Sequence, residues 1–140
     1  MDTNAALAGT LIQRGVILIV HPNPHAEHPK FFVVIGENDE ELVGYFLINT
    51  DPSNYVKSRP DFMNMQMHIK RSDYSDFLKY DSFIACHELS KISKCMLISK
   101  IQNSEAAYRG ELTNEDLERL MDNLRNSKLY SKVEKEIFFK

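Results

Sequence analysis

Three apolar runs separated by polar breaks dominate the first third of the chain. They span Val16–Val20, Phe31–Ile35 and Leu42–Ile48. Each run is rich in Val, Ile and Phe, whose branched and aromatic side chains fit a pleated strand, and each is bounded by Pro, Gly, Asn or Asp. The runs are too short and too evenly apolar for amphipathic helices. They predict three strands covered on both faces, as in a small closed or strongly curled sheet, with the second and third paired as an antiparallel hairpin.

The middle of the chain predicts shorter elements. Residues 63–69 alternate Met or Ile with polar residues, which is the period-two pattern of a half-buried strand. Residues 82–86 form a short apolar run that predicts a buried strand, and residues 89–101 predict a strand followed by a short helix. Residues 49–61 are polar and contain two prolines, so we expect a long loop there, and loops of that length tend to be functional.

The clearest helix signal lies near the C-terminal end of the chain. Thr113 offers a side-chain cap, and Asp116 follows three residues later, so the pair resembles a capping box with Asp in place of Glu. Four apolar residues then fall on one helical face: Leu117, Leu120, Met121 and Leu124. The pattern predicts a helix at about 113–126. Residues 128–139 predict either a second helical stretch or a docking tail.

Composition bounds the class of protein. A chain of 140 residues predicts a single domain, here residues 14–140, after a leader of residues 1–13 that is either disordered or a short helical turn. The net charge of −3 excludes a global basic field but leaves a local basic groove open. Cys86 and Cys95 are too few for a disulfide framework, so we expect reduced, partly buried thiols in a cytoplasmic protein. No signal-peptide pattern and no run of roughly 18 apolar residues occurs, so no membrane partner is expected.

A cluster of imidazole and carboxylate groups follows the first predicted strand. It comprises His21, His25, Glu27 and His28. These are ligand types that zinc uses, but their spacing matches no standard zinc motif and the loop is stiffened by proline. A solvated polar loop is therefore favoured over a metal site.

The polar segment 49–61 carries a second candidate, a nucleic-acid contact. Lys57 and Arg59 supply positive charge there, and Tyr55 supplies a ring on which a base can stack. Acidic residues such as Asp51 and Asp61 lie among them, as on an ordinary mixed-charge surface. Composition alone favours that ordinary surface.

Taken in order, these pieces resemble the PemK/MazF toxins of bacterial toxin–antitoxin systems. The likeness is carried by an opening Gly followed by an apolar strand, by a second strand, by the end of a third, by an Asp-Ser before another apolar strand, and by a Gly before the last helix. These segments are Arg14–Val20, Lys30–Ile35, Ile48–Thr50, Tyr80–Cys86 and Gly110–Leu112. The resemblance covers about residues 14–126.

The resemblance implies a fold and an activity. The fold would be mainly β with helical additions (α+β), a small SH3-like, PemK-type curled β-barrel with a C-terminal helix, and a homodimer. The activity would be cleavage of single-stranded RNA without metal or cofactor, leaving a 2′,3′-cyclic phosphate, and the further partner would be an antitoxin protein. Such cleavage needs a base for the ribose 2′-hydroxyl, a cation at the phosphate and an acid for the leaving oxygen.

The same resemblance implies the site residues. The family places an Arg at the head of the second strand and a Thr or Ser at the end of the third. Thr50 matches, whereas Lys30 stands where the family has Arg, and lysine lacks the planar fork that grips two phosphate oxygens. His28 is a further acid–base candidate, because unperturbed histidine titrates near pH ~6.5. Lys57, Arg59 and Tyr55 are the expected RNA contacts.

Two other interpretations stay open. The missing Arg and the acidic balance favour a binding module, in which the same barrel holds RNA or a partner protein without catalysis. A weaker alternative is a metal-binding domain that uses His21, His25 and His28.

Overall fold

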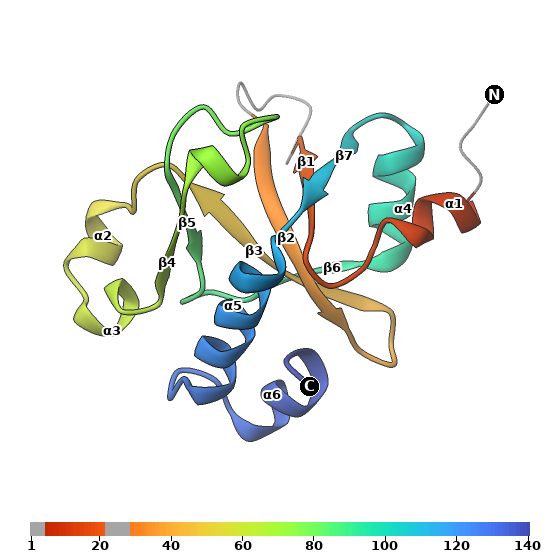
Figure 1. Cartoon of the computed structure of the whole chain (residues 1–140). Helices are drawn as coiled ribbons and strands as arrows, with labels where there is room; N and C mark the ends of the chain where they lie inside the picture. The colour runs from red at the N-terminus through yellow and green to blue at the C-terminus, as the bar shows by residue number, and fades with distance from the viewer. Residues whose placement is uncertain (1–4, 22–28) are drawn as a thin grey trace.

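The computed structural model describes residues 5–21 and 29–140. In that part of the chain, seven strands form one antiparallel sheet, accompanied by six α-helices and one short 3-10 helix (Figure 1). The strands are β1 (Val16–Val20), β2 (Lys30–Glu37), β3 (Leu42–Asn49), β4 (Gln66–Ile69), β5 (Ser82–Ala85), β6 (Ser90–Ser93) and β7 (Ala106–Glu111). The helices are α1 (Ala5–Thr10), α2 (Asn54–Lys57), α3 (Pro60–Met63), the 3-10 helix η1 (Arg71–Asp73), α4 (Lys94–Gln102), α5 (Asn114–Asn126) and α6 (Lys132–Phe138).

Strand β3 holds the sheet together. The strand order is β4-β5-β3-β2-β1-β7, and β6 also pairs with β3. The start of β3 pairs with β6 over Leu42–Tyr45, and its end pairs with β5 at Ile48 and Asn49. Within the described residues the path ends at β4 on one side and β7 on the other, so the sheet is open. The expected closure into a barrel is therefore wrong, while the mixture of an antiparallel sheet with helices is confirmed.

Long apolar runs and a capped amphipathic helix were predicted well. The strand over Val16–Val20, the hairpin of β2 and β3, the strand β5 and the strand–helix pair β6–α4 are all confirmed. The long loop expected at 49–61 is wrong, because it contains α2 and the first residues of α3. The strand expected over 63–69 begins only at Gln66, and β7 was not expected.

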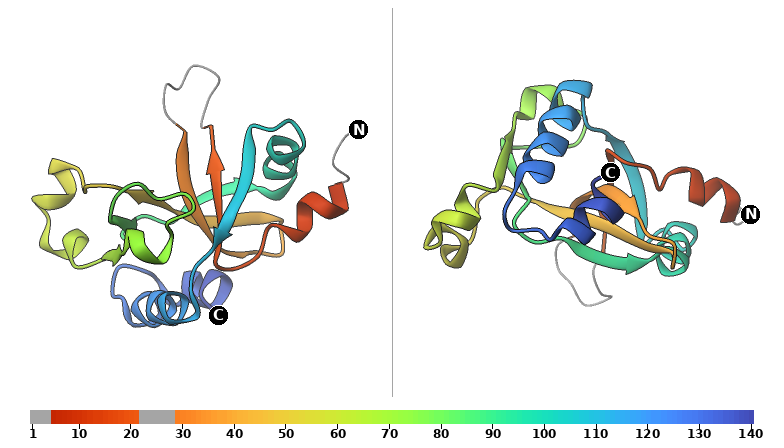
Figure 2. Two further views of the ribbon diagram at one scale, coloured as in Figure 1. Left: turned by 45° about the horizontal axis from the view of Figure 1, so that its top comes forward. Right: turned by 90° about the horizontal axis from the view of Figure 1, so that it is seen from below.

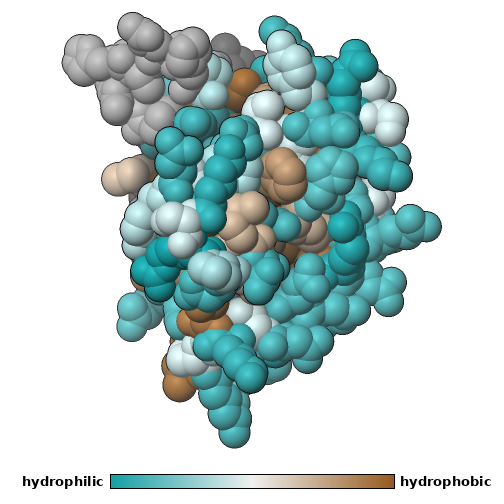
Figure 3. Space-filling view, turned by 90° about the vertical axis from the view of Figure 1, so that its left-hand side faces the viewer, coloured by the Kyte–Doolittle hydropathy of each residue, from teal (hydrophilic) through white to brown (hydrophobic). Residues whose placement is uncertain are grey.

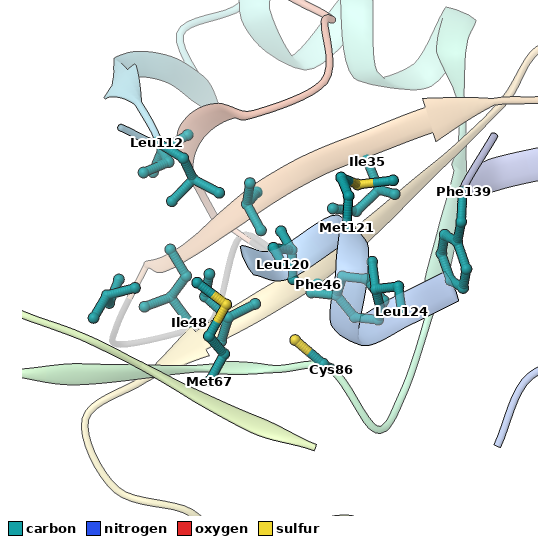
Figure 4. Close-up of a cluster of buried hydrophobic side chains, with 14 of the residues drawn as sticks. Ile35, Phe46, Ile48, Met67, Cys86, Leu112, Leu120, Met121, Leu124 and Phe139 are labelled. Carbon is teal, nitrogen blue, oxygen red and sulfur yellow. The ribbon is translucent and has the colours of Figure 1, made fainter. Parts of the chain in front are cut away.

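Two hydrophobic cores cover the two faces of the sheet, as the evenly apolar strands predicted. On one face, α5 and α6 pack over the sheet, and Figure 4 shows Leu120, Met121 and Leu124 of α5 directed at Ile35 and Phe46. On the other face, α1 and α4 pack together over a second cluster of buried residues. The views in Figure 2 place α1 and α4 at the opposite side of the molecule from α2 and α3.

The leader contributes to the second core. Helix α1 packs against α4, and Ala8 is completely buried. The alternative of a short helical turn is thus the one observed for Ala5–Thr10. The chain then enters β1 through Gly15, whose φ of +90° is a conformation that residues with a side chain rarely adopt. Gly15 donates its backbone N–H to Val34 O and accepts from Leu112 N, so this turn joins β2 to the segment before α5.

Helix α5 begins with the predicted cap. The hydroxyl of Thr113 accepts from Asp116 N at 3.1 Å. In a capping box, the side chain at position 116 would accept directly from the N–H of Thr113. Here the N–H of Thr113 donates to the phenol oxygen of Tyr74, and the phenol donates to Asp116. The shorter Asp side chain reaches the cap through this phenol instead of directly.

The C-terminal residues are fixed on the β2–β3 hairpin. Helix α6 carries a full capping box between Ser131 and Glu134, and the side chains of Phe138 and Phe139 are buried in the first core. Arg14 donates hydrogen bonds to the backbone oxygens of Ile35, Phe138 and Lys140. The helical stretch expected at 128–139 is confirmed.

Candidate functional site

Two adjoining pockets meet at Lys30 and Leu47 and form one groove along the sheet. The polar pocket has a volume of about 370 Å³ and lies beside α2. The apolar pocket has a volume of about 490 Å³ and lies beside β6 and α4. Figure 3 views the side that carries α2 and α3, where hydrophilic residues cover most of the surface and hydrophobic residues show in a recess near its centre.

The polar pocket forms because β5 and β6 pair with opposite ends of β3. Strand β5 leaves β3 after Ile48 and Asn49 have paired, and β6 rejoins it at Tyr45. The connection between them carries His87 and Glu88 past the uncovered middle of β3, so both residues line the pocket. Residues from the α2 region close the other side. The lining residues that carry polar groups are Lys30, Asn49, Asp51, Ser53, Gln66, His87, Glu88 and Ser90.

His87 is the most enclosed ionisable side chain in this pocket. Its side chain is only 10% exposed, and the ring of Phe62 lies against the imidazole with 4.9 Å between centroids. Nε2 of Gln66 lies 2.8 Å from Nδ1 of His87. Burial lowers the pKa of His87, and the nearby Glu88 carboxylate opposes that shift only in part. His87 is therefore an uncharged side chain near neutral pH.

The apolar pocket combines an aromatic floor with lysines. The rings of Phe32 and Tyr45 pack with 4.4 Å between centroids, and Met96 of α4 is 56% exposed at its edge. Lys30 and Lys100 also line this pocket, as does Lys91, although the ammonium of Lys91 lies over the Phe138 ring of the other core. Lys100 is held by Glu105 at 3.5 Å and by the backbone oxygen of His21 at 3.3 Å. This half of the groove thus offers apolar area next to positive charge.

Lys30 and Thr50 do not share a pocket. Lys30 lines the groove, whereas Thr50 lines a different pocket with Phe31, Ile48 and Phe77. Phe31 pairs with Ile48, so Lys30 is in register with Asn49, and successive residues of a strand face opposite sides. The expectation that Lys30 and Thr50 meet at one ligand is therefore wrong.

A β-bulge accounts for this outcome. Near the turn, Gly36 pairs with Gly44, and continuing that register would place Thr50 opposite Lys30. The register shifts between Val34 and Gly36, which moves every later pair by one residue. A slip of one residue exchanges the two faces of a strand. Asn49 consequently takes the place beside Lys30 that the resemblance implied for Thr50.

The expected RNA contacts lie on α2 and at the start of α3. The ammonium of Lys57 is 2.9 Å from Asp51, which lines the polar pocket. The guanidinium of Arg59 lies 4.2 Å from the ring centroid of Phe62 and 3.3 Å from Asp61. Tyr55 is 63% exposed. Lys57 and Arg59 are thus both paired with acids of their own chain, at positions that are more than a third exposed to solvent.

The histidine cluster falls mostly outside the described residues. His25, Glu27 and His28 belong to residues 22–28, for which no placement is given, so the structure does not test His28 as an acid–base group or the cluster as a metal site. Among residues 5–21 and 29–140, no group of three or more His, Cys, Asp or Glu side chains is placed to hold a metal ion.

Both cysteines are free, as predicted, but their burial differs. Cys86 is 1% exposed, and burial raises the pKa of its thiol to about 12, whereas Cys95 is exposed. In the part of the chain that the structure describes, none of the helices combines the length and the apolar character needed to cross a membrane.

Sequence reasoning identified Lys30 but missed other residues that make the polar pocket. His87, Gln66 and Asn49 were not singled out as site residues. One signal was available, since His87 and Glu88 follow directly after a buried strand, where polar side chains commonly form sites. Gln66 and Asn49 carry no comparable signal, because their roles depend on the register of β3 and on the path of the chain between β5 and β6. No protein-family model matches this chain, and no curated protein matches it.

Proposed function

We propose that this chain is a metal-independent endoribonuclease of the PemK/MazF toxin type, related to those SH3-like proteins despite its open sheet, and that it cleaves single-stranded RNA in the groove. The observation that carries the proposal is the position of Lys30. Its side chain lines both pockets, so one exposed cation stands where the polar half meets the apolar, lysine-lined half. A phosphodiester bound where the two pockets meet would lie beside the ammonium of Lys30, and the adjoining ribose would enter the polar pocket.

The apolar half of the groove suits the strand next to the cleaved bond. Bases of single-stranded RNA bind by stacking on aromatic and apolar surface, while lysines follow the phosphates. Tyr45 and Met96 supply accessible apolar surface, and Lys30 and Lys100 supply the charge. The net charge of −3 is compatible with such local binding, because Lys30 and Lys100 both line the apolar half of the groove.

The polar half contains the groups that the chemistry requires. In the proposed reaction the 2′-oxygen bonds to phosphorus as its proton passes to the carboxylate of Glu88, and the bond from phosphorus to the 5′-oxygen breaks. The ammonium of Lys30 neutralises the phosphate and gives a proton to the leaving 5′-oxygen, and both groups then exchange protons with water. The products are a 2′,3′-cyclic phosphate and a free 5′-hydroxyl, so no further reactant is needed.

The proposal extends to the protein partners that the resemblance implies. An antitoxin would cover the same groove, whose apolar half exposes Met96, and a second copy of the chain would complete a homodimer. Size-exclusion chromatography with light scattering measures whether the purified chain is a dimer.

The test is a cleavage assay on 5′-labelled single-stranded RNA of mixed sequence, run with EDTA at low salt, with the product ends identified by mass. We expect cleavage by the wild type, a 2′,3′-cyclic phosphate end, and loss of cleavage by Lys30→Ala and Glu88→Gln. Lys79→Ala is the matched control, since Lys79 is an exposed lysine of the pocket that contains Thr50. Thr50→Ala should lose less activity than Lys30→Ala. Absence of wild-type cleavage, or equal activity of Lys30→Ala and Lys79→Ala, would overturn the proposal.

A second candidate function is RNA binding without cleavage. It is favoured by the absence of the family's Arg, since Lys30 stands in its place. In that case RNA would bind with an affinity that falls steeply with salt, since phosphate contacts release counterions, and no product would form. The cleavage assay and a binding titration on the same RNA separate the two functions.

A further inference from the structure

Gln66 and Phe62 contact the imidazole of His87, and neither residue takes part in the proposed cleavage reaction. Nε2 of Gln66 donates to the backbone oxygen of Phe62 at 3.0 Å and lies 2.8 Å from Nδ1 of His87. The ring of Phe62 packs against the imidazole with 4.9 Å between centroids, and the guanidinium of Arg59 also packs on that ring. Helix α3 therefore fixes both the plane of the imidazole and the neighbour of one ring nitrogen.

The position of Phe62 decides which way the Gln66 amide points. A backbone carbonyl only accepts, so the side-chain atom of Gln66 that faces it must be the NH₂ group. The same NH₂ group faces Nδ1 of His87, and an NH₂ group only donates. Nδ1 must consequently be the acceptor, which leaves the proton of the neutral imidazole on Nε2.

We propose that Gln66 is a positioning residue that holds His87 in the Nε2–H tautomer, so that the pocket presents a neutral hydrogen-bond donor to a phosphate oxygen. The inference rests on the proposed function for its ligand, but the tautomer itself is a property of the free protein. His87 then stabilises charge on the phosphate without acting as the base, because its only lone pair is occupied by Gln66. The base must be a carboxylate of the same pocket.

The charged groups around His87 agree with this role. Nε2 lies 3.8 Å from Oε2 of Glu88, and Lys30 and Asp51 line the same pocket. Glu88 is exposed and can turn to accept from Nε2–H until a phosphate takes its place. On the side of α3, the Phe62 ring lies against the imidazole, and burial lowers the pKa of His87, which favours the uncharged imidazole.

The experiment is a long-range ¹H–¹⁵N NMR measurement of histidine tautomers on the full chain, without RNA, from acid to neutral pH. Five histidines contribute signals, and His87→Asn identifies the one that belongs to His87. We expect the Nε2–H pattern for His87 in the wild type. In Gln66→Glu a carboxylate replaces the donor, so His87 should become protonated at Nδ1 and titrate at a higher pH than in the wild type. Gln66→Leu should lose the preference for the Nε2–H tautomer.

The outcomes are distinguishable from those of the cleavage assay. The Nε2–H pattern in the wild type together with the shift in Gln66→Glu supports the positioning role even if no RNA is cleaved, in which case only the proposed function fails. An Nδ1–H pattern in the wild type, or an unchanged titration of His87 in Gln66→Glu, overturns the inference even if RNA is cleaved. Because an Nδ1–H pattern in the wild type overturns the inference without any variant, the inference remains falsifiable if Gln66→Glu fails to fold.

Discussion

The phenol of Tyr74 donates a hydrogen bond of 2.6 Å to Asp116, and both side chains are buried. The same phenol oxygen accepts from the N–H of Thr113 at 3.0 Å, so Tyr74 connects the loop after η1 to the first turn of α5. Asp116 is further bound by Arg119 at 2.9 Å. One phenol thus completes a helix cap and satisfies a buried carboxylate, across 42 residues of sequence.

We predict that Tyr74→Phe destabilises the protein by about 1–3 kcal/mol, because it leaves one oxygen of the buried Asp116 and the part-buried Thr113 N–H without their partner. Urea unfolding followed by circular dichroism measures the loss. Tyr80→Phe is the matched control, since Tyr80 is 65% exposed, and its effect should stay within about 0.5 kcal/mol. Equal stability of the two variants would show that the Tyr74 network does not support α5.

We predict that stability falls as the pH rises from about 9 to 12. Burial raises the pKa of Tyr74 to about 12, that of Cys86 to about 12, and that of Tyr130 further. In each case the folded state holds its proton more tightly than the unfolded chain does. The stabilisation is therefore complete below the pKa of the unfolded chain, and it is lost as the pH rises toward the folded value.

Urea midpoints measured at intervals between pH 7 and 12 test the alkaline loss. Tyr74→Phe removes one of the three groups, so its stability should decline less steeply than that of the wild type over this range. A slope that is the same in both proteins would mean that Tyr74 does not contribute.

We predict that a side chain at Gly36 of the β2–β3 hairpin lowers the free energy of unfolding. A Cβ there would lie 2.8 Å from the backbone oxygen of Phe138, in the segment that Arg14 clamps. A backbone atom cannot move aside as a side chain can, so Gly36→Ala should cost about 1–3 kcal/mol and loosen the C-terminal residues. At Gly44 the nearest atom, at 2.9 Å, belongs to the Phe138 ring, so Gly44→Ala should cost less than Gly36→Ala.

Gly9→Ala is the control for these glycine variants. No atom lies within 4 Å of a Cβ at Gly9, which is part of α1, so alanine should be neutral there or stabilise by up to about 1 kcal/mol. Thermal unfolding and hydrogen exchange of residues 132–140 provide the measurement. Gly36→Ala with wild-type stability and exchange would contradict the close packing of the tail.

The parts of the fold that were predictable are those in which local pattern and tertiary packing agree. The strand over Val16–Val20 is a short continuous apolar run, and helix α5 carries apolar residues at helical spacing, so each could be identified from its own residues. Helices α2 and α3 have four residues each, too few to show a helical period. Their only sequence signals are the cap at Ser53 and the Pro60 at the start of α3.

The site was less predictable than the fold, because it depends on register. A single bulge between Val34 and Gly36 decides whether Asn49 or Thr50 lies beside Lys30, and nothing in the apolar pattern reveals it. Gln66 and His87 are 21 residues apart in sequence. Their contact depends on how the chain runs from β4 to β5 and on where it goes after β5. Pattern reasoning locates strands, whereas contacts between their ends require the three-dimensional path.

We predict that the salt dependence of RNA binding depends on Lys30. Lys30 is exposed and lines both halves of the groove. On single strands, each neutralised phosphate changes the slope of log K against log salt by about 0.7. Lys30→Gln should therefore make the salt dependence shallower by about that amount.

Fluorescence anisotropy with a labelled single-stranded RNA, titrated at several salt concentrations, measures this slope, and Glu88→Gln serves as background so that no RNA is consumed during the titration. Lys79→Gln is the charge-matched control, because Lys79 lines the pocket that contains Thr50 instead of the groove. If Lys79→Gln changed the slope as much as Lys30→Gln, the RNA would not bind selectively in the groove. A slope that Lys30→Gln leaves unchanged would show that Lys30 contacts no phosphate, because loss of such a contact reduces the number of counterions released on binding.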